Sequence, residues 1–298
     1  MKTNIEKLPK STVKITVSVE SDILKKTYEK VLDEAVKTAN IEGFRPGTAP
    51  REMVKEKIGQ NKLFGETINE VLEIYYPQTL KENAIFPVSE PKVEVKEFNL
   101  EKDLEFSATV AVRPEIKVND YRSKLKQVFE KKLLDAKEEL KKSQKPGEEN
   151  GEPHVHLSPN EVIEAILNSS EVEISDLLLE DETDRLLSRF VDQAQSIGLS
   201  LEQYLKSQNK TGEQLRKEYG KIAENNIKAE FALSELIKME KIEVSNEEVE
   251  SMIKAAGDPK LVKADDPMQR LYIKSILQKN KLITKLIEET EGDKHHDH

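Results

Sequence analysis

The sequence contains neither cysteine nor tryptophan and is poor in aromatic residues, with 8 Phe and 7 Tyr in 298 residues. Without cysteine, disulfides and thiolate metal sites are excluded. Hydrophobic residues make up 36% of the chain and charged residues 35%. A chain of this length has room for two or three domains. The composition predicts that each has a small core and a large hydrated surface.

Several sequence signals of particular functions are also missing. No apolar run approaches the roughly 20 residues that a membrane span needs, and residues 1–10 contain charges and Pro9 but no apolar signal segment. We therefore expect a cytoplasmic protein with no membrane partner. The chain also lacks a Gly-x-x-x-x-Gly-Lys-Ser/Thr loop for nucleotides, and no Ser/His/Asp set stands in a structured context. We expect no catalytic residues and no cofactor.

The five histidines fall into two groups, at 154 and 156 and at 295, 296 and 298. Such a tail binds a divalent metal weakly, or it is simply a polar end of the chain. The second interpretation is favoured, and no metal site is expected.

Charge is unevenly distributed along the chain. The net charge is −10, but residues 1–113 hold 18 Lys and Arg against 19 Asp and Glu, whereas residues 114–298 hold 29 against 38. Because a strongly acidic surface repels nucleic acid, DNA is not an expected partner. Any contact with RNA has to come from a local patch in the N-terminal part.

The first 113 residues carry the pattern of an α+β domain. Residues 11–20 alternate apolar and polar, as in a half-buried strand, and Ser21 and Asp22 are candidates for the N-cap of a following helix. Helical spacing runs to Ala39, stops at a turn-rich stretch, and resumes over residues 53–75. Two more alternating stretches follow, at 93–95 and 104–112. The predicted order is β-α-loop-α-α-β-β, ending near Arg113.

The rest of the chain is predicted to be helical. Residues 114–157 are expected to form a linker that contains a charged helix, because residues 143–159 are rich in Pro, Gly and acids. Residues 158–290 are expected to form an elongated all-α domain with helical arms. Four capping boxes mark its helix starts, at Ser158/Glu161, Ser200/Gln203, Thr211/Gln214 and Ser245/Glu248. A final helix is expected over 268–289, followed by a disordered tail at 291–298.

The stretch from Gly43 to Pro50 is the most informative in the sequence. Two glycines and two prolines fix the loop, and Phe44 and Arg45 stand at its tip. An exposed aromatic beside an arginine is typical of an interface anchor, and arginine also pairs with phosphates. From Phe44 to Lys62 there are five basic residues against two acids, which fits docking on RNA or on an acidic protein. The alternative is that Phe44 packs beneath its own domain and the loop only connects helices.

Residues 41–50, Ile-Glu-Gly-Phe-Arg-Pro-Gly-Thr-Ala-Pro, resemble the ribosome-binding signature of the bacterial trigger factor family, Gly-Phe-Arg-x-Gly-x-x-Pro. The resemblance implies a ribosome-binding domain whose loop docks beside the tunnel exit on a ribosomal protein and nearby RNA. The residues implied in ribosome binding are Gly43, Phe44, Arg45, Pro46, Gly47 and Pro50. Pro46 and Thr48 stand where the family often has basic residues. Residues 158–290 resemble the family's helical substrate-binding domain by helix order and pattern.

Members of this family usually carry an FKBP-like prolyl-isomerase domain of roughly a hundred residues between these two parts. Residues 114–157 are too few for it, show no series of strands, and contain Tyr121 and Phe129 as their only aromatics. A short form without the isomerase is therefore expected.

The resemblance implies an ATP-independent chaperone that shields nascent or unfolded polypeptides at the ribosome, with a possible homodimer off it. Residues that could contact clients are apolar side chains of the helical half, each of which is otherwise an ordinary core residue: Leu177, Leu178, Leu179, Phe190, Ile197, Tyr204, Tyr219, Phe231, Met239, Met252, Met268 and Tyr272. The alternatives are a ribosome-independent cytoplasmic holdase or assembly chaperone, a prolyl isomerase with an unrecognised site, and a structural helical adaptor.

Overall fold

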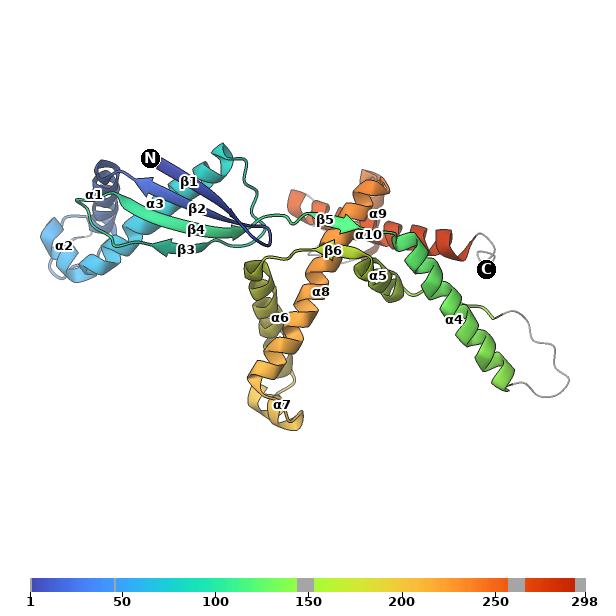
Figure 1. Cartoon of the computed structure of the whole chain (residues 1–298). Coiled ribbons are helices and arrows are strands. Elements are labelled where there is room, and N and C mark those ends of the chain that lie inside the picture. The colour runs from blue at the N-terminus through green and yellow to red at the C-terminus, as the bar shows by residue number, and fades with distance from the viewer. Residues whose placement is uncertain (1, 46, 144–152, 257–265, 293–298) are drawn as a thin grey trace. The chain divides into compact units, whose positions relative to one another are not determined.

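The computed structural model describes residues 2–45, 47–143, 153–256 and 266–292. Contacts divide the chain into two units (Figure 1). The first consists of residues 1–113 and 175–181, and the second consists of residues 114–174 and 182–298. Each unit has its own hydrophobic cores.

The first unit contains a four-stranded antiparallel sheet in the order β1-β2-β4-β3. The strands are β1 (Lys2–Leu8), β2 (Thr12–Val19), β3 (Lys92–Val95) and β4 (Leu104–Ala111). The last three confirm the alternating stretches of the sequence. β1 was not predicted, because an edge strand with mostly exposed side chains shows little alternation.

Helices α1 (Ser21–Thr38) and α3 (Gln60–Glu82) pack against one face of this sheet, and α2 (Arg51–Ile58) packs against these two helices. Ile15, Val17 and Phe106 are fully buried on that face. The predicted cap of α1 is wrong. Its N-cap is Glu20, which makes no side-chain cap bond, and the Ser21 N–H instead binds Asp103 Oδ1 at 3.0 Å.

The second unit is helical, with one short two-stranded sheet that the all-α prediction did not include. The sheet pairs β5 (Ile116–Val118) with β6 (Ser170–Val172). The helices are α4 (Tyr121–Ser143), α5 (Pro159–Asn168), α6 (Asp176–Ser196), α7 (Leu201–Ser207), α8 (Gly212–Met239), α9 (Asn246–Ala256) and α10 (Pro267–Glu291). The first residues of α6 are grouped with the first unit.

A central core joins α4, α5, α8 and α10. Tyr121 and Leu125 of α4 are buried in it. The prediction that residues 114–157 form a linker is therefore wrong for α4, which belongs to the helical unit. Val155 and Leu157 are also buried, so the end of the expected linker packs against the unit too; residues 144–152 lie outside the described residues.

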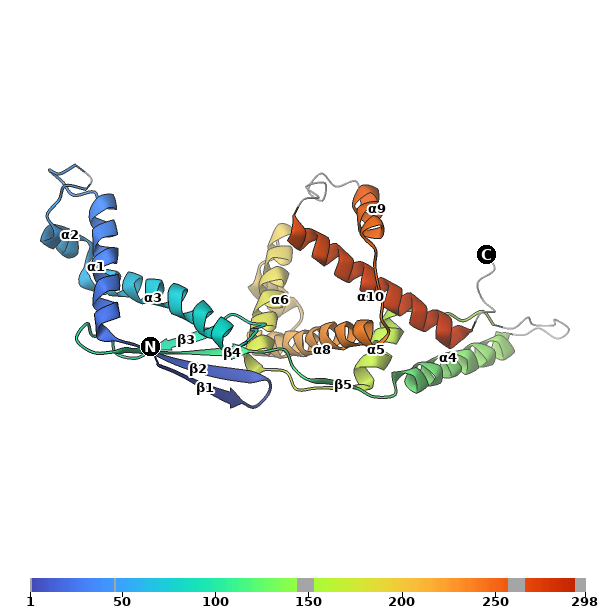
Figure 2. The same ribbon diagram turned by 90° about the horizontal axis from the view of Figure 1, so that it is seen from above.

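Two helical arms extend from this core. Figure 1 shows α6, α7 and the first half of α8 running together. Figure 2 shows α9 next to α10, where Val244, Val249, Ile253 and Ile273 form a separate small core. The four predicted capping boxes are all present, each with its reciprocal hydrogen bonds.

The end of α10 corrects the predicted tail. Glu291 belongs to the helix, and its side chain is only 3% exposed. It accepts a hydrogen bond from the Leu157 N–H at 2.6 Å and contacts His156 Nδ1 at 3.0 Å. Residues 293–298, and with them the three C-terminal histidines, lie outside the described residues.

Glu240, at the C-terminal end of α8, ties three helices together. Its carboxylate receives hydrogen bonds from Lys285 at 2.6 Å, Tyr121 at 2.5 Å and Arg122 at 2.7 Å. The Lys285 bond is the largest cause, and the Tyr121 bond the next, of a Glu240 pKa lowered to about 2. Because burial opposes ionisation, the carboxylate is stable in this position only with these donors.

We predict that Glu240→Gln lowers the unfolding free energy of the helical unit by roughly 1–3 kcal/mol at pH 7. A folded-state pKa below the unfolded value means that this contribution is complete above about pH 5 and is lost as the pH falls toward 2. Urea unfolding at several pH values measures both effects. The wild-type and variant curves should converge at low pH, and Glu289→Gln, which removes a more exposed carboxylate, should have a smaller effect. Equal stabilities at pH 7 would contradict the role of Glu240.

Candidate functional site: the loop between α1 and α2

The loop between α1 and α2 is anchored at both ends by buried side chains. Ile41 and Ala49 are each 7% exposed and join Val54 and Leu63 in a core beneath α1 and α2. The backbone between them turns twice, with the Phe44 N–H bound to the Ile41 carbonyl at 3.1 Å and the Thr48 N–H bound to the Arg45 carbonyl at 3.0 Å. The two anchors and the two turns constrain the described part of the loop.

Both glycines of the loop adopt backbone angles that other residues disfavour. The φ of Gly43 is +82° and that of Gly47 is +88°. In this region a Cβ is strained, so the sequence needs glycine at these two positions. No heavy atom lies within 4 Å of where either Cβ would stand, which indicates that the constraint is backbone conformation and not crowding.

The tip presents Phe44 and Arg45 to solvent. Phe44 is 38% exposed, and Arg45 is exposed and makes no ion pair with the described residues. This arrangement matches the exposed alternative of the sequence analysis. Gly43, Gly47 and Pro50 are also exposed, Pro50 being the N-cap of α2. Pro46 lies outside the described residues.

The basic patch predicted from Phe44 to Lys62 is smaller than its sequence suggests. Arg51 binds Glu29 at 2.8 Å and also pairs with Asp33, both on α1. Lys55 pairs with Glu52 at 3.1 Å. The Arg51 pairs join α2 to α1, whereas the Lys55 pair lies within α2. Of the five basic residues, Arg45, Lys57 and Lys62 make no ion pair within the described part of the chain.

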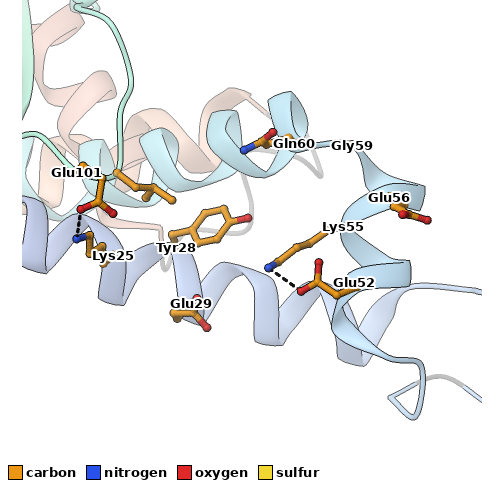
Figure 3. A pocket seen from close by; sticks show the side chains of 10 residues that line it. Lys25, Tyr28, Glu29, Glu52, Lys55, Glu56, Gly59, Gln60 and Glu101 are labelled. Carbon is orange, nitrogen blue, oxygen red and sulfur yellow. Dashed lines mark hydrogen bonds and ion pairs between the residues drawn. The ribbon is translucent and has the colours of Figure 1, made fainter.

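A groove of about 800 Å³ lies between α1, α2 and the start of α3, and its lining contains no described residue of the loop (Figure 3). Tyr28 and Leu100 provide its apolar lining, while Lys25 pairs with Glu101 at 2.8 Å on one side and Lys55 with Glu52 on the other. Of the other charged lining residues, Glu29 binds Arg51, and Glu56 is exposed and makes no ion pair among the described residues. A single exposed carboxylate is not a set of groups arranged for acid–base or nucleophilic chemistry. Among the described residues, no cluster of three His, Asp or Glu side chains could hold a metal ion.

The predicted client-contacting residues divide into two groups. Ile197, Met239, Met252 and Tyr272 are exposed, by 79%, 55%, 44% and 67%, and Met268 is also exposed. Leu177, Leu178, Leu179, Phe190, Tyr204, Tyr219 and Phe231 are only partly exposed. The first group is available to a partner, and the second also contributes to packing.

Three of the partly exposed residues form an aromatic cluster within one arm. The ring of Phe190 lies 4.7 Å from that of Tyr204 and 5.5 Å from that of Tyr219. Their contacts join α6, α7 and α8, and burial raises the pKa of Tyr219. The interpretation as helix–helix packing, given as the alternative above, therefore applies to these three side chains.

Sequence analysis missed Leu271, which is 61% exposed. It stands three residues after Met268 and one before Tyr272, so the three share a side of α10. The helical spacing from Met268 would have identified it.

Among the described helices, none combines the length and apolar character needed to cross a bilayer.

Comparisons with known proteins place this geometry in a family context. The model of the bacterial trigger factor protein matches residues 1–143, and that of the trigger factor C-terminus matches residues 132–289. The two matches overlap, which leaves no room between them for a further domain. A trigger factor of Desulforamulus reducens is 35% identical over 122 residues, covering 41% of this chain and 28% of that protein. One of Clostridium kluyveri is 33% identical over 146 residues, covering 48% and 34%.

The matched stretches thus span about a third of the length of these relatives. A solved structure described as "Promiscuous Substrate Recognition in Folding and Assembly Activities of the Trigger Factor Chaperone" aligns with 97% of this chain and 100% of its own. The TM-score is 0.66 and the sequence identity 16%. At that identity the likeness concerns the fold alone.

We predict that Phe44→Ala lowers the unfolding free energy of the first unit by less than about 1 kcal/mol, because an exposed ring contributes little to folding. Ile41→Ala, which empties a buried position of the same loop, should cost about 2–4 kcal/mol. Urea unfolding of the two variants measures the difference. A loss at Phe44 as large as that at Ile41 would mean that the ring is part of the core.

Proposed function

The chain belongs to the bacterial trigger factor family, and from that premise we propose that it is an ATP-independent chaperone that docks on the ribosome through the tip of the 43–50 loop. The observation that carries this proposal is the exposed pair Phe44 and Arg45, held between the buried anchors Ile41 and Ala49. A fixed loop loses little conformational entropy on binding, so more of its contact energy remains as affinity. Docking at the ribosome would place the protein in the cytoplasm.

The contact proposed for the loop is mixed in character. Phe44 supplies apolar area to a ribosomal protein, and Arg45 supplies a planar fork that suits a carboxylate or an RNA phosphate. Gly43, Gly47 and Pro50 shape the backbone around them, and Pro46 is proposed as part of the contact from its place in the sequence alone. Since Arg51 and Lys55 are already paired within the domain, affinity should depend on the tip more than on a general basic surface.

We further propose that the helical arms hold unfolded or nascent segments by their exposed apolar side chains. Ile197, Met239, Met252 and Tyr272 present separate apolar areas among charged residues. Each buried Å² contributes about 25 cal/mol, offset by ordering costs, so weak and sequence-tolerant binding is expected. A tether at the tunnel exit raises the effective client concentration. No prolyl-isomerase activity is proposed, because the two family matches meet at residues 132–143.

We predict that Phe44→Ala and Arg45→Ala each weaken co-sedimentation with intact ribosomes at least tenfold, as expected for an interface anchor. Phe86→Ala is the matched control, because it removes an exposed ring (77%) of the same unit outside the loop. It should leave co-sedimentation unchanged. Unchanged binding of both loop variants would instead favour a ribosome-independent holdase.

We predict that replacing Ile197, Met239, Met252 and Tyr272 together by Ser removes at least half of the protection that the chain gives an aggregating client, because apolar contact area is lost. Light scattering of a chemically unfolded client measures this. Glu202→Ser with Glu247→Ser, two exposed polar positions on the arms, is the control and should keep full protection. The wild-type chain should not accelerate proline-limited refolding. If the fourfold variant protects as well as the wild type, these side chains are not the client surface.

A further inference from the structure

Strand β3 lies at an edge of the four-stranded sheet, and no strand among the described residues pairs with its other side (Figure 1). The Lys96 N–H donates to the Glu105 carbonyl opposite it at 3.0 Å. In an antiparallel pair, hydrogen-bonded and non-hydrogen-bonded residue pairs alternate. The N–H and C=O groups of Val93 and Val95 therefore point away from β4, toward the open side.

The side chains of the same two residues lie on the core face of the sheet. Val93 stands opposite Ala108 and Val95 opposite Phe106, and both of these β4 residues are fully buried. Directly opposite residues share a face, yet Val93 and Val95 are each 37% exposed. The apolar layer between the sheet and the helices thus extends to β3, where its last two side chains, Val93 and Val95, are partly exposed to solvent.

The other edge of the sheet is protected in a way that β3 is not. On β1, the core-face positions are Thr3, Ile5 and Lys7, which stand opposite Val17, Ile15 and Val13. An inward-pointing charge on an edge strand, such as Lys7, is a common device against pairing with another chain. β3 has valine at both of its core-face positions. Of the two edges, β3 is therefore the one suited to accept a further strand.

The size of the edge limits what can pair with it. Four residues extend about 13 Å, whereas a stable dimer interface buries about 800 Å² on each partner. A second copy of this chain would gain too little from this edge alone, and Pro91 directly before β3 limits its extension. A short extended segment matches the available length. On the opposite face, Lys92, Glu94 and Lys96 alternate in charge, which disfavours strongly charged segments of either sign.

We propose that β3 binds a short extended segment of an unfolded polypeptide as a fifth strand of the sheet. Backbone groups of the segment pair with those of Val93 and Val95, and its apolar side chains at alternate positions continue the layer beside the two valines. This inference rests on the proposed chaperone function and assigns part of client binding to the first unit. Because most of the bonds involve only the backbone, the site tolerates many sequences with alternating apolar residues.

Val95→Pro tests the pairing, because proline removes one outward N–H while the bonds between β3 and β4 remain. The probe is a fluorescent seven-residue peptide of alternating Val and Thr with a terminal Lys, added to the full chain and followed by anisotropy. We expect at least fivefold weaker binding to Val95→Pro than to the wild type. Val95→Thr keeps the N–H but reduces the apolar surface, and it should give an intermediate loss.

A second measurement keeps the test decisive if Val95→Pro fails to fold. The same peptide, N-methylated at alternate residues along the edge that faces β3, cannot form the strand bonds and should bind the wild-type chain at least fivefold more weakly. Hydrogen exchange at the amides of Val93 and Val95 should slow when the unmodified peptide is added. Equal binding of both peptides, or of a folded Val95→Pro, would overturn the inference.

The outcome is separable from that of the proposed function. If the wild-type chain gives a client no protection from aggregation, the chaperone proposal fails, whatever the peptide does. If protection is normal but peptide binding ignores Val95→Pro and N-methylation, only the role of β3 fails.

Discussion

The burial of Ile41 and Ala49 beneath α1 and α2 is the constraint on which the proposed ribosome contact depends. A free twelve-residue connection would hold Phe44 and Arg45 in many positions, and ordering it would cost roughly 1–2 kcal/mol for each residue fixed. The two anchors shorten the free stretch, and the positive φ values of Gly43 and Gly47 turn it back on itself. The ordering cost is therefore met when the domain folds and not when the partner binds. The same small core also holds α2 in place. A substitution that destabilises this core is therefore expected to displace the tip as well.

The basic residues between Arg45 and Lys62 provide less free positive charge than their number in the sequence suggests. A run of basic residues from Arg45 to Lys62 indicates an electrostatic patch, but Arg51 and Lys55 bind acids of their own domain. Ion pairs of this exposed kind contribute little to stability, yet each removes a cation from the surface that a phosphate could reach. What remains without an ion pair among the described residues is Arg45, beside the Phe44 ring at the tip, and Lys57 and Lys62 on α2 and α3. A contact of that kind depends more on shape and position than on the overall field, which suits a chain with a net charge of −10.

Local sequence signals predicted the local structure well, and they could not predict contacts between distant segments. The alternation over residues 11–20 and 104–112 identified β2 and β4, and the four capping boxes located helix starts, because in each case the interacting residues are neighbours in sequence. The Gly-Phe-Arg stretch likewise located the loop. By contrast, α4 was predicted as a charged helix within a linker, because the contact of Tyr121 with Glu240, more than a hundred residues away, leaves no local signal. Glu291 was assigned to a tail for the same reason, since its partner Leu157 is distant. β1 left almost no pattern because its core-face positions, Thr3, Ile5 and Lys7, include one apolar residue only.

The two proposed client surfaces, the arms and the β3 edge, each bind many client sequences, but for different physical reasons. The arms offer separated apolar side chains, so binding there follows the apolar area of the client and is indifferent to backbone conformation. The β3 edge offers backbone donors and acceptors, so it binds client segments in an extended conformation. It contacts the client's side chains only at alternate positions. An unfolded chain contains both kinds of segment, and a segment that has already become helical loses access to the edge while keeping its apolar face. Client release would then begin at β3, because internal hydrogen bonds formed in the client compete directly with the strand contact there. The arms would stay bound until the client buries its own apolar surface.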